Sequence, residues 1–296
     1  MSAADRRLLL VHAHPDDETI TTGGTIARYL QEGADVLVVT CTLGEEGEVI
    51  GEQWAGLAAE LGDGVRGADQ LGGFRIGELT AALAALTPAD RAPLRPHFLG
   101  GAGRWRDSGM VGTASTSNPR AFTNAGDLPT HALAALIRQF RPQVLVGYDE
   151  VGSYGHPDHI QVNRICGAAI DLAADAWTVS KHYWTVVEES ALQAGLRAAG
   201  SRVPVGWTYP AAAELPSHPD SEVTAVVDVS SVLDRKVAGL AAHATQVTVA
   251  ASGTEYALSN NVIQPILDEE HYMLVGGLPG PVGADGRERD LFAGLD

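Results

Sequence analysis

The chain has 296 residues, and 45% of them are hydrophobic, enough to fill the core of one large α/β domain. Its formal net charge of −17 would repel a phosphate backbone, so we expect no nucleic-acid partner. It has no signal-like segment, no apolar run near the roughly 18 residues that span a membrane, and too few cysteines for a disulfide framework, so we expect a cytoplasmic protein without a membrane partner.

The first predicted element is a short strand that ends in polar residues. Residues 8–11 are apolar, and His14, Pro15, Asp16 and Asp17 follow. Because proline cannot continue a strand ladder, these residues should lie at the carboxyl end of the strand, where open α/β sheets bind ligands. One histidine and one aspartate suit a divalent metal, and a second aspartate beside that metal could take a proton from its water.

A helix and a second strand follow. Residues 18–31 have helical spacing, Gly33 ends that helix, and residues 35–42 form a strand pattern, so the segment predicts two parallel strands joined by a helix. The loop 43–49 is acidic and contains glycines, and it should lie on the same rim as His14. Acidic loops are usually only solvated, and a substrate contact is the alternative.

The middle of the chain alternates helical patterns with glycine-rich segments. Residues 53–87 look helical but contain several glycines, and the alanine-leucine run at 79–86 ends before Pro88. A short third strand at 97–99 leads into the loop 100–110, which is rich in glycine, arginine and tryptophan. This loop is either flexible surface or a cover for substrate, because long structured loops at strand ends tend to carry sites.

The opening pattern then returns. A helix at 131–140 and a strand at 143–148 precede a loop that ends in His156, Pro157, Asp158 and His159. Both His-Pro-Asp tetrapeptides follow an apolar strand and precede a helix, so both should lie on one rim of the sheet. Proline suits the first helical position, which leaves His159 in the first turn.

The C-terminal part predicts further strands and one helix. Strand patterns cover 181–187 and 221–229, a helix covers 230–244, residues 195–220 look like loop, and 256–274 mixes strand and turn. With no break in composition, we expect one domain over 1–296. Residues of about 1–180 would form its core, and residues 181–296 would pack against that core. The fold class is α/β, a mostly parallel sheet flanked by helices with a smaller C-terminal β-containing lobe.

The paired motifs predict a metal-dependent hydrolase. His14, Asp17 and His159 would supply two nitrogens and one oxygen, the usual ligand set of a hydrolytic zinc with one open position, although iron(II) and cobalt(II) accept the same set. Asp16 would then serve as the base, and His156 could stabilise charge on a carbonyl oxygen.

Tyr154 lies two residues before His156 and has two equally supported roles. Its hydroxyl could donate a hydrogen bond to the same carbonyl oxygen, or its ring could simply pack across the neighbouring glycine turns. The sequence pattern does not separate these roles.

A family resemblance adds to these predictions. Residues 13–18 together with 155–159 resemble the signature pair of the LmbE-like (PIG-L) family of metal-dependent N-acetylglucosaminyl deacetylases. Three further stretches, 40–50, 70–79 and 101–110, are similar to the branch of that family in the mycothiol pathway. The resemblance implies a Rossmann-like fold, one divalent metal per chain with zinc preferred, and a small amino-sugar inositol substrate. The expected reaction converts N-acetylglucosaminyl-inositol into glucosaminyl-inositol and acetate in mycothiol biosynthesis.

The resemblance also implies roles for individual side chains. It assigns His14, Asp17 and His159 to the metal, and Asp16 to the base and also the acid. It assigns the remaining positions as follows: His156 and Tyr154 to the oxyanion, Arg75, Asp107 and Glu48 to the sugar and inositol hydroxyls, Asp158 to orienting the ring of His156 or His159, and Gln246 to the metal rim.

Two alternatives remain at this stage. The sister enzyme of the pathway, mycothiol S-conjugate amidase, resembles the same metal set but cleaves a different amide. A non-catalytic sugar- or nucleotide-binding module with the same fold would need no base, so Asp16 beside Asp17 argues against it. No G-x-G-x-x-G follows the first strand, which makes dinucleotide binding improbable.

Overall fold

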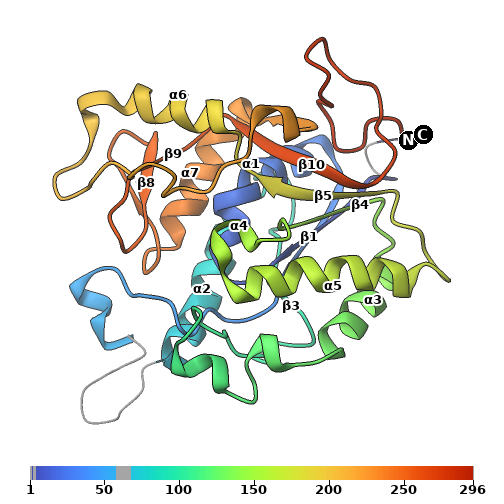
Figure 1. Cartoon of the computed structure of the whole chain (residues 1–296), viewed down its shortest axis with the longest axis horizontal. Coiled ribbons are helices and arrows are strands. Elements are labelled where there is room, and N and C mark those ends of the chain that lie inside the picture. Colours follow the sequence, from blue (N-terminus) through green and yellow to red (C-terminus); the bar gives the residue numbers. More distant parts are fainter. Residues whose placement is uncertain (1, 3–4, 58–67, 296) are drawn as a thin grey trace.

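The computed structural model describes residues 2, 5–57 and 68–295 and has a central sheet between two layers of helices (Figure 1). Seven strands form this sheet in the order β3-β2-β1-β4-β5-β10-β6, and β7-β8-β9 form a small second sheet. The strands are β1 (Arg7–His12), β2 (Asp35–Thr40), β3 (His97–Phe98), β4 (Val144–Gly147), β5 (Lys181–Val186), β6 (Ala225–Asp228), β7 (Thr248–Val249), β8 (Glu255–Ala257), β9 (Gln264–Pro265) and β10 (Glu269–Gly277).

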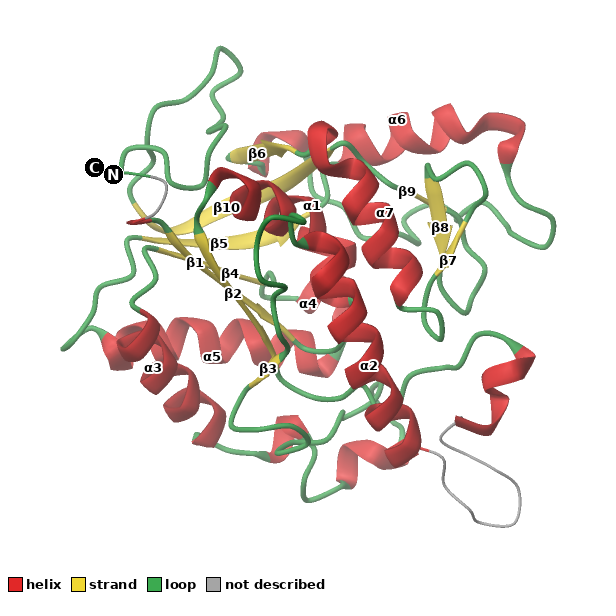
Figure 2. Cartoon of the chain, turned by 180° about the vertical axis from the view of Figure 1, so that it is seen from behind, coloured by secondary structure: helices red, strands yellow, loops and turns green. Residues whose placement is uncertain are grey.

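Helices cover both faces of the large sheet. α3 and α5 lie on one face, α1 and α2 lie on the other, and α7 packs against α1 and α2 (Figure 2). The helices are α1 (Asp17–Glu32), α2 (Ala68–Leu86), α3 (Leu128–Phe140), α4 (Gly152–Gly155), α5 (Pro157–Ala173), α6 (Glu189–Ala199) and α7 (Leu233–Ala242).

Alternate residues of β1 enter the two helix-covered cores. Leu8 and Leu10 pack with residues of α1 and α2, whereas Leu9 and Val11 pack with residues of α3 and α5. Because successive side chains of a strand point to opposite faces, a strand covered on both faces needs an uninterrupted apolar run. The run that predicted the first strand is thus explained by its place in the middle of the sheet.

The five strands from β3 to β5 are parallel, so their carboxyl ends share one edge. β10 is antiparallel to both of its neighbours, β5 and β6. The expected α/β class with a mostly parallel sheet and additional C-terminal strands is confirmed. β6 and β10 extend the large sheet itself, and only the short strands β7 to β9 form a separate one.

Two segments differ from the sequence-based expectation. The segment 195–220 was expected to be loop, but α6 (Glu189–Ala199) extends into its first residues. This helix forms because Leu192 and Leu196, four positions apart, pack on one side of it with Ile263 in a separate small core. Within 53–87, a short 3₁₀ helix ends at Leu57 and α2 begins at Ala68, and residues 58–67 lie outside the described part of the chain.

A buried ion pair attaches the C-terminal segment to β5. Lys181 Nζ lies 2.5 Å from Glu288 Oε1, and the Tyr183 hydroxyl donates to Glu288 Oε2 at 2.6 Å. The side chains of Lys181 and Glu288 are each 1% exposed. A charge buried to this extent needs its partner, because water cannot replace it.

We therefore expect Glu288→Gln to lower the free energy of unfolding by about 3–5 kcal/mol, since it leaves the Lys181 charge buried without a counter-charge. Asp175→Asn is the control, because Asp175 pairs with Arg138 in water and is 75% exposed; its loss should cost less than about 1 kcal/mol. Urea unfolding of both variants measures the difference, and equal small losses would contradict the expectation.

Candidate active site

The two histidine motifs meet where β1 and β4 end side by side. The loop after β1 carries His14 and Asp16 into α1, and the loop after β4 carries Tyr154 and His156 into α5. His14 lies beside Asp158 although 144 positions separate them in the sequence. The shared edge of parallel strands therefore brings together residues that the sequence keeps apart.

One oxygen of Asp17 lies between two histidine rings. Asp17 Oδ2 is 3.2 Å from His14 Nδ1 and 3.3 Å from His159 Nε2. All three residues are buried, and His159 Nε2 makes no well-aligned hydrogen bond to any described residue. Ligand atoms of His14, His156 and His159 lie within 4.8 Å of one another, as do those of His14, Asp107 and Asp158, so the cluster around His14, with Asp17 Oδ2 between two of its rings, offers nitrogen and oxygen donors that fit a divalent metal.

His14 is held from its other side by carboxylates. Its Nε2 lies 3.3 Å from Asp158 Oδ2 and 3.5 Å from Asp107 Oδ1. Carboxylates commonly hold the second nitrogen of a metal-binding histidine, so this contact leaves Nδ1 for the metal. The Asp158 carboxylate thus contacts the ring of His14, whereas we had expected it to orient His156 or His159.

The field around these histidines is strongly negative. Burial lowers the pKa of His14, but hydrogen bonds and charge from Asp107, Asp158 and Asp17 outweigh it and raise that pKa well above its ordinary value. Burial likewise opposes ionisation of Asp17, but the charge of His159 and the close approach of both histidine rings to its carboxylate hold the pKa of Asp17 well below its ordinary value. A bound dication would be stabilised by the same negative charge.

Asp16 has a different environment from its neighbour Asp17. Its backbone has φ 107° and ψ −39°, a conformation that costs a residue with a side chain about 1–3 kcal/mol. Burial raises the pKa of Asp16 to about 6, against the lowering effect of Arg75, whose Nη2 lies 3.2 Å from Asp16 Oδ2. A carboxylate with a raised pKa is suited to accept and return a proton near neutral pH.

Arg75, from α2, bridges the loops that follow β1 and β2. Its Nη1 donates to Gly44 O at 2.7 Å, and its Nη2 donates to Pro15 O. A Cβ atom at Gly44, where φ is 65°, would collide with the guanidinium group. Glycine is required there by this close approach. The Nε of Arg75 is buried and has no hydrogen-bond partner among the described residues.

His156 begins α5 as its N-cap. Its Nδ1 accepts a hydrogen bond from the Asp158 backbone N–H at 3.2 Å, which assigns the ring proton to Nε2. Burial, together with the charges of His14 and His159, lowers the pKa of His156 to about 3. The ring is therefore a neutral donor, suited to an oxygen on which negative charge develops.

Tyr154 lies at the mouth of the site. Its ring centroid is 5.1 Å from that of His159 and 5.9 Å from that of His156, and the residue is 54% exposed. Ser153 before it has φ 61° and ψ −79°, so the short helix α4 is irregular at this point. The ring packs on both histidines while remaining accessible to a ligand.

The other predicted residues lie around this centre. Asp107 is buried; its Oδ1 accepts from Gly109 N–H at 2.8 Å and its Oδ2 from Glu46 N–H at 3.2 Å. Glu48 is exposed, and its carbonyl oxygen accepts from Gln246 Nε2 at 3.2 Å. The fold thus brings Asp107 to His14, and it brings Glu48 and Gln246 together further out.

Tyr148, the residue directly after β4, was not among the predicted residues. Its ring stacks on His159 with centroids 4.1 Å apart and planes inclined by 16°. Its hydroxyl oxygen accepts a hydrogen bond from Ala13 N–H at 3.1 Å, and the residue is fully buried. The stacked ring fixes the orientation of His159.

Sequence reasoning also missed Glu18 and His243. Glu18 Oε1 lies 2.8 Å from His243 Nε2, and both residues are fully buried. Glu18 closes the first motif, so its position was visible in the sequence. Nothing local links it to His243, which lies 225 positions further along the chain.

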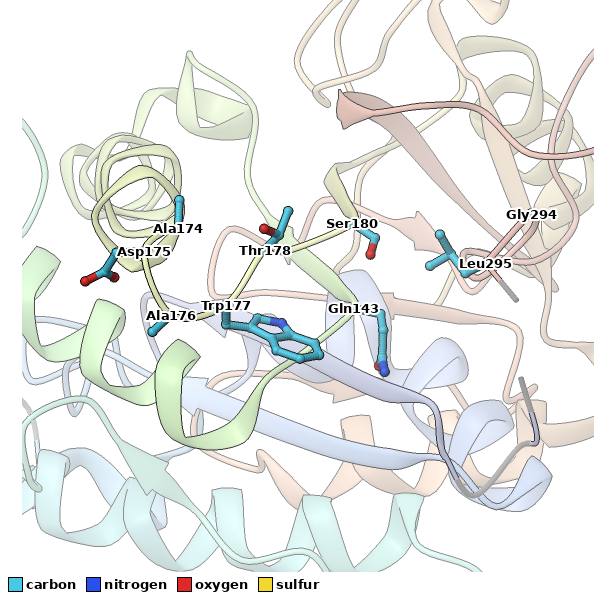
Figure 3. Close-up of a pocket in the computed structure, with 9 residues that line it drawn as sticks. All are labelled: Gln143, Ala174, Asp175, Ala176, Trp177, Thr178, Ser180, Gly294 and Leu295. Atoms are coloured by element: carbon cyan, nitrogen blue, oxygen red, sulfur yellow. The ribbon is translucent and has the colours of Figure 1, made fainter.

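A cavity of about 630 Å³ lies away from this site (Figure 3). Its lining includes Gln143, just before β4, and Ser180, just before β5. These positions belong to the amino ends of parallel strands, whereas His14 and His156 follow the carboxyl ends. The cavity therefore has no part in the chemistry of the histidine cluster.

A family model and full-length relatives both match this chain. A family model described as PIG-L, GlcNAc-PI de-N-acetylase, matches residues 9–170. The chain is 60% identical to the 1D-myo-inositol 2-acetamido-2-deoxy-alpha-D-glucopyranoside deacetylase of Rhodococcus jostii (strain RHA1), with 99% of each chain covered. It is 62% identical to the protein of that name from Rhodococcus opacus (strain B4), again with 99% of each covered.

One solved structure has the same fold but a different described activity. The 4-carboxy-2-hydroxymuconate hydratase GalB of Pseudomonas putida KT2440 superposes with a TM-score of 0.55 and 16% identity, over 94% of this chain and 100% of that one. Such a likeness shows the fold alone. Chemistry on this fold has to be argued from the residues at the rim of the sheet.

Tyr148 offers a test of the metal-site geometry. Tyr148→Phe keeps the ring on His159 and removes the hydroxyl with its contacts to Ala13 N–H, His12 Nδ1 and Asp17, so it should cost about 1–3 kcal/mol of stability and change the affinity for a divalent metal far less than loss of the ring does. Tyr148→Ala removes the stacked ring and should weaken that affinity about 10–100-fold. Titration calorimetry of metal-stripped protein measures both, and unchanged affinity in Tyr148→Ala would refute the orienting role.

Proposed function

The chain belongs to the PIG-L family, and from this premise we propose that it hydrolyses the N-acetyl amide of 1D-myo-inositol 2-acetamido-2-deoxy-alpha-D-glucopyranoside, releasing acetate and the free amine. The observation that carries the proposal is the identity of 60% over 99% of both chains to a relative named for this reaction. The resemblance of residues 40–50, 70–79 and 101–110 supports a place in mycothiol biosynthesis.

We propose His14, Asp17 and His159 as the ligands of one divalent metal. The support is the position of Asp17 Oδ2 within 3.3 Å of a nitrogen of each histidine. Zinc is the proposed ion and iron(II) the alternative, since two imidazoles and a carboxylate suit either. When bound, the ion would supply Lewis acidity, lowering the pKa of a coordinated water and polarising the amide carbonyl.

The remaining groups would move protons and hold charge. Asp16 accepts a proton from the attacking water and returns it to the nitrogen of the leaving amine, so that the C–N bond breaks as the new C–O bond is retained. His156 donates its Nε2–H to the carbonyl oxygen as negative charge builds there. Tyr154, which lies in the irregular helix α4, donates its hydroxyl hydrogen to the same oxygen. The raised pKa of Asp16 and the neutral ring of His156 support these roles.

We further propose that Arg75, Asp107 and Glu48 contact the sugar and inositol hydroxyls, with Gln246 at the rim beside Glu48. The contact of 3.2 Å between Arg75 Nη2 and Asp16 Oδ2, which sets the guanidinium beside the proposed base, supports this role for Arg75. The substrate is a small molecule, and we propose a cytoplasmic location. No helix in the described part of the chain is long and apolar enough to cross a membrane.

The reaction is tested by offering two substrates to the zinc-loaded protein. We expect rapid release of the amine from N-acetylglucosaminyl-inositol and turnover at least tenfold slower with a mycothiol S-conjugate, with both activities lost in metal-stripped protein and restored by zinc or iron(II). Preference for the conjugate would assign the sister amidase activity instead. Absence of turnover with both substrates would favour the binding module.

The two neighbouring aspartates should separate in their effects. Asp17→Asn removes an anionic ligand, so metal content and activity should fall together and recover partly with excess ion. Asp16→Asn keeps the shape but removes basicity, so the turnover rate should fall by about a hundredfold or more at unchanged metal content. Metal analysis and rates on the two purified variants decide the matter; an Asp16→Asn protein that is inactive because it lacks metal would reverse the assignment.

A further inference from the structure

The last residue of the first motif, Glu18, forms a buried acid–base pair with His243. Glu18, in the first turn of α1, and His243, just after α7, are both 0% exposed. Glu18 Oε1 lies 2.8 Å from His243 Nε2 and accepts from the Thr19 hydroxyl at 2.5 Å. α1 and α7 pack side by side, so the pair links the start of one helix to the end of the other (Figure 1).

The second oxygen of Glu18 reaches the strained residue. Glu18 Oε2 accepts from the backbone N–H of Asp16 at 3.0 Å. Asp16 has φ 107°, a value that residues with a Cβ rarely adopt, and such strain persists only where the surroundings enforce it. A hydrogen bond to a carboxylate is among the stronger ones, particularly where water is excluded.

The strained conformation of Asp16 sets the start of α1 and the directions of the two neighbouring carboxylates. The carbonyl of Asp16 accepts from Thr19 and Ile20 N–H, so Asp16 is the N-cap and α1 starts at the next residue, Asp17. Asp16 can therefore direct its carboxylate to Arg75 while Asp17, the next residue, directs its own to the histidines. Two adjacent side chains face different partners because the backbone turns sharply between Pro15 and Asp17.

We propose that Glu18, fixed by His243, is a positioning residue that holds Asp16 in this backbone conformation and so aims the base at the water. The inference rests on the proposed role of Asp16. It assigns a task to two residues that lie outside the predicted ligand, base and substrate contacts. Arg75 holds the side chain of Asp16, and Glu18 holds its main chain.

The test compares Glu18→Met with Glu18→Gln. Methionine fills the space but accepts no hydrogen bond, so kcat on N-acetylglucosaminyl-inositol should fall by about a hundredfold, the scale of a 1 Å misplacement, with KM and zinc content unchanged. Glutamine retains an acceptor for Asp16 N–H and should restore at least a tenth of the wild-type kcat. If Glu18→Met turns over as fast as the wild type, the proposal is overturned.

A double variant separates positioning from general stability. In the Asp16→Asn background, Glu18→Met should cause no further fall in kcat, because a positioned base is no longer present. Glu78→Met is the matched control: Glu78 is also buried and holds Thr245 N–H at 2.8 Å, in the segment that carries His243, and any effect it has should be equal in both backgrounds. An equal effect of Glu18→Met in both backgrounds overturns the proposal.

A crystal structure of Glu18→Met supplies a readout that does not depend on turnover. We expect φ of Asp16 to leave the positive region and its carboxylate to move away from Arg75; an unchanged φ overturns the proposal. If Asp16→Asn alone keeps the wild-type rate, the base assignment fails, and this structure still decides whether Glu18 holds the backbone. Should Glu18→Met not fold, His243→Phe, which leaves the carboxylate without its imidazole partner, is measured in the same ways.

Discussion

The site depends on the balance of buried charge around His14. Asp17, Asp107 and Asp158 all approach this ring, and each is 8% exposed or less. Buried carboxylates are costly unless hydrogen bonds or cations compensate them. Backbone N–H groups supply part of the compensation, for example from Ser108 to Asp158 at 2.9 Å. The histidines and a divalent metal would supply the rest, which is why the same geometry serves both the fold and the proposed chemistry.

The sheet makes this balance possible through the adjacency of β1 and β4. A His-Pro-Asp turn follows each strand, shortly after β1 and beyond the short helix α4 after β4, and a long helix begins at each turn, so two sets of side chains converge from neighbouring strands. Arg75 from α2 and the His243 segment after α7 then tie the first turn to the helices on one face. The strand ends thus position the two turns, and helices α2 and α7, which come later in the chain than the first turn, hold that turn in place.

The local parts of this arrangement could be predicted from the sequence, whereas the distant ones could not. The apolar run before His14 and the proline after it indicate a strand end, and the repeated motif at His156 indicates a shared rim. The partner of Glu18 could not be predicted, because His243 meets it only through the packing of α7 on α1. The ring that Asp158 contacts was likewise decided by tertiary packing, since Ser108 and His14 fix its carboxylate from two other loops.

The positions of β10 and α6 show the same limit. A strand pattern near 256–274 does not reveal that β10 enters the large sheet between β5 and β6, because its partners are set by long-range pairing. The spacing of Leu192 and Leu196 is typical of a helix. However, α6 packs with Ile263 in a separate small core, so the pattern of the main sheet does not predict its position. Neither element contributes a residue to the histidine cluster, so the prediction that the two histidine motifs share a rim did not depend on either of them.

The two adjacent aspartates differ in their surroundings in a way that suits the two roles proposed for them. Histidine charge and hydrogen bonds hold the pKa of Asp17 down, and burial raises that of Asp16 to about 6. A pair of carboxylates whose environments separate their pKa values is the usual mark of a division between a group that stays ionised and a group that exchanges protons. Here the separation goes with different partners: Asp16, with φ 107°, has its carboxylate beside Arg75, whereas the carboxylate of Asp17 lies beside His14 and His159. In the proposed mechanism, the strain at this residue is thus the local cost of having the proposed metal ligand and the proposed base at consecutive positions.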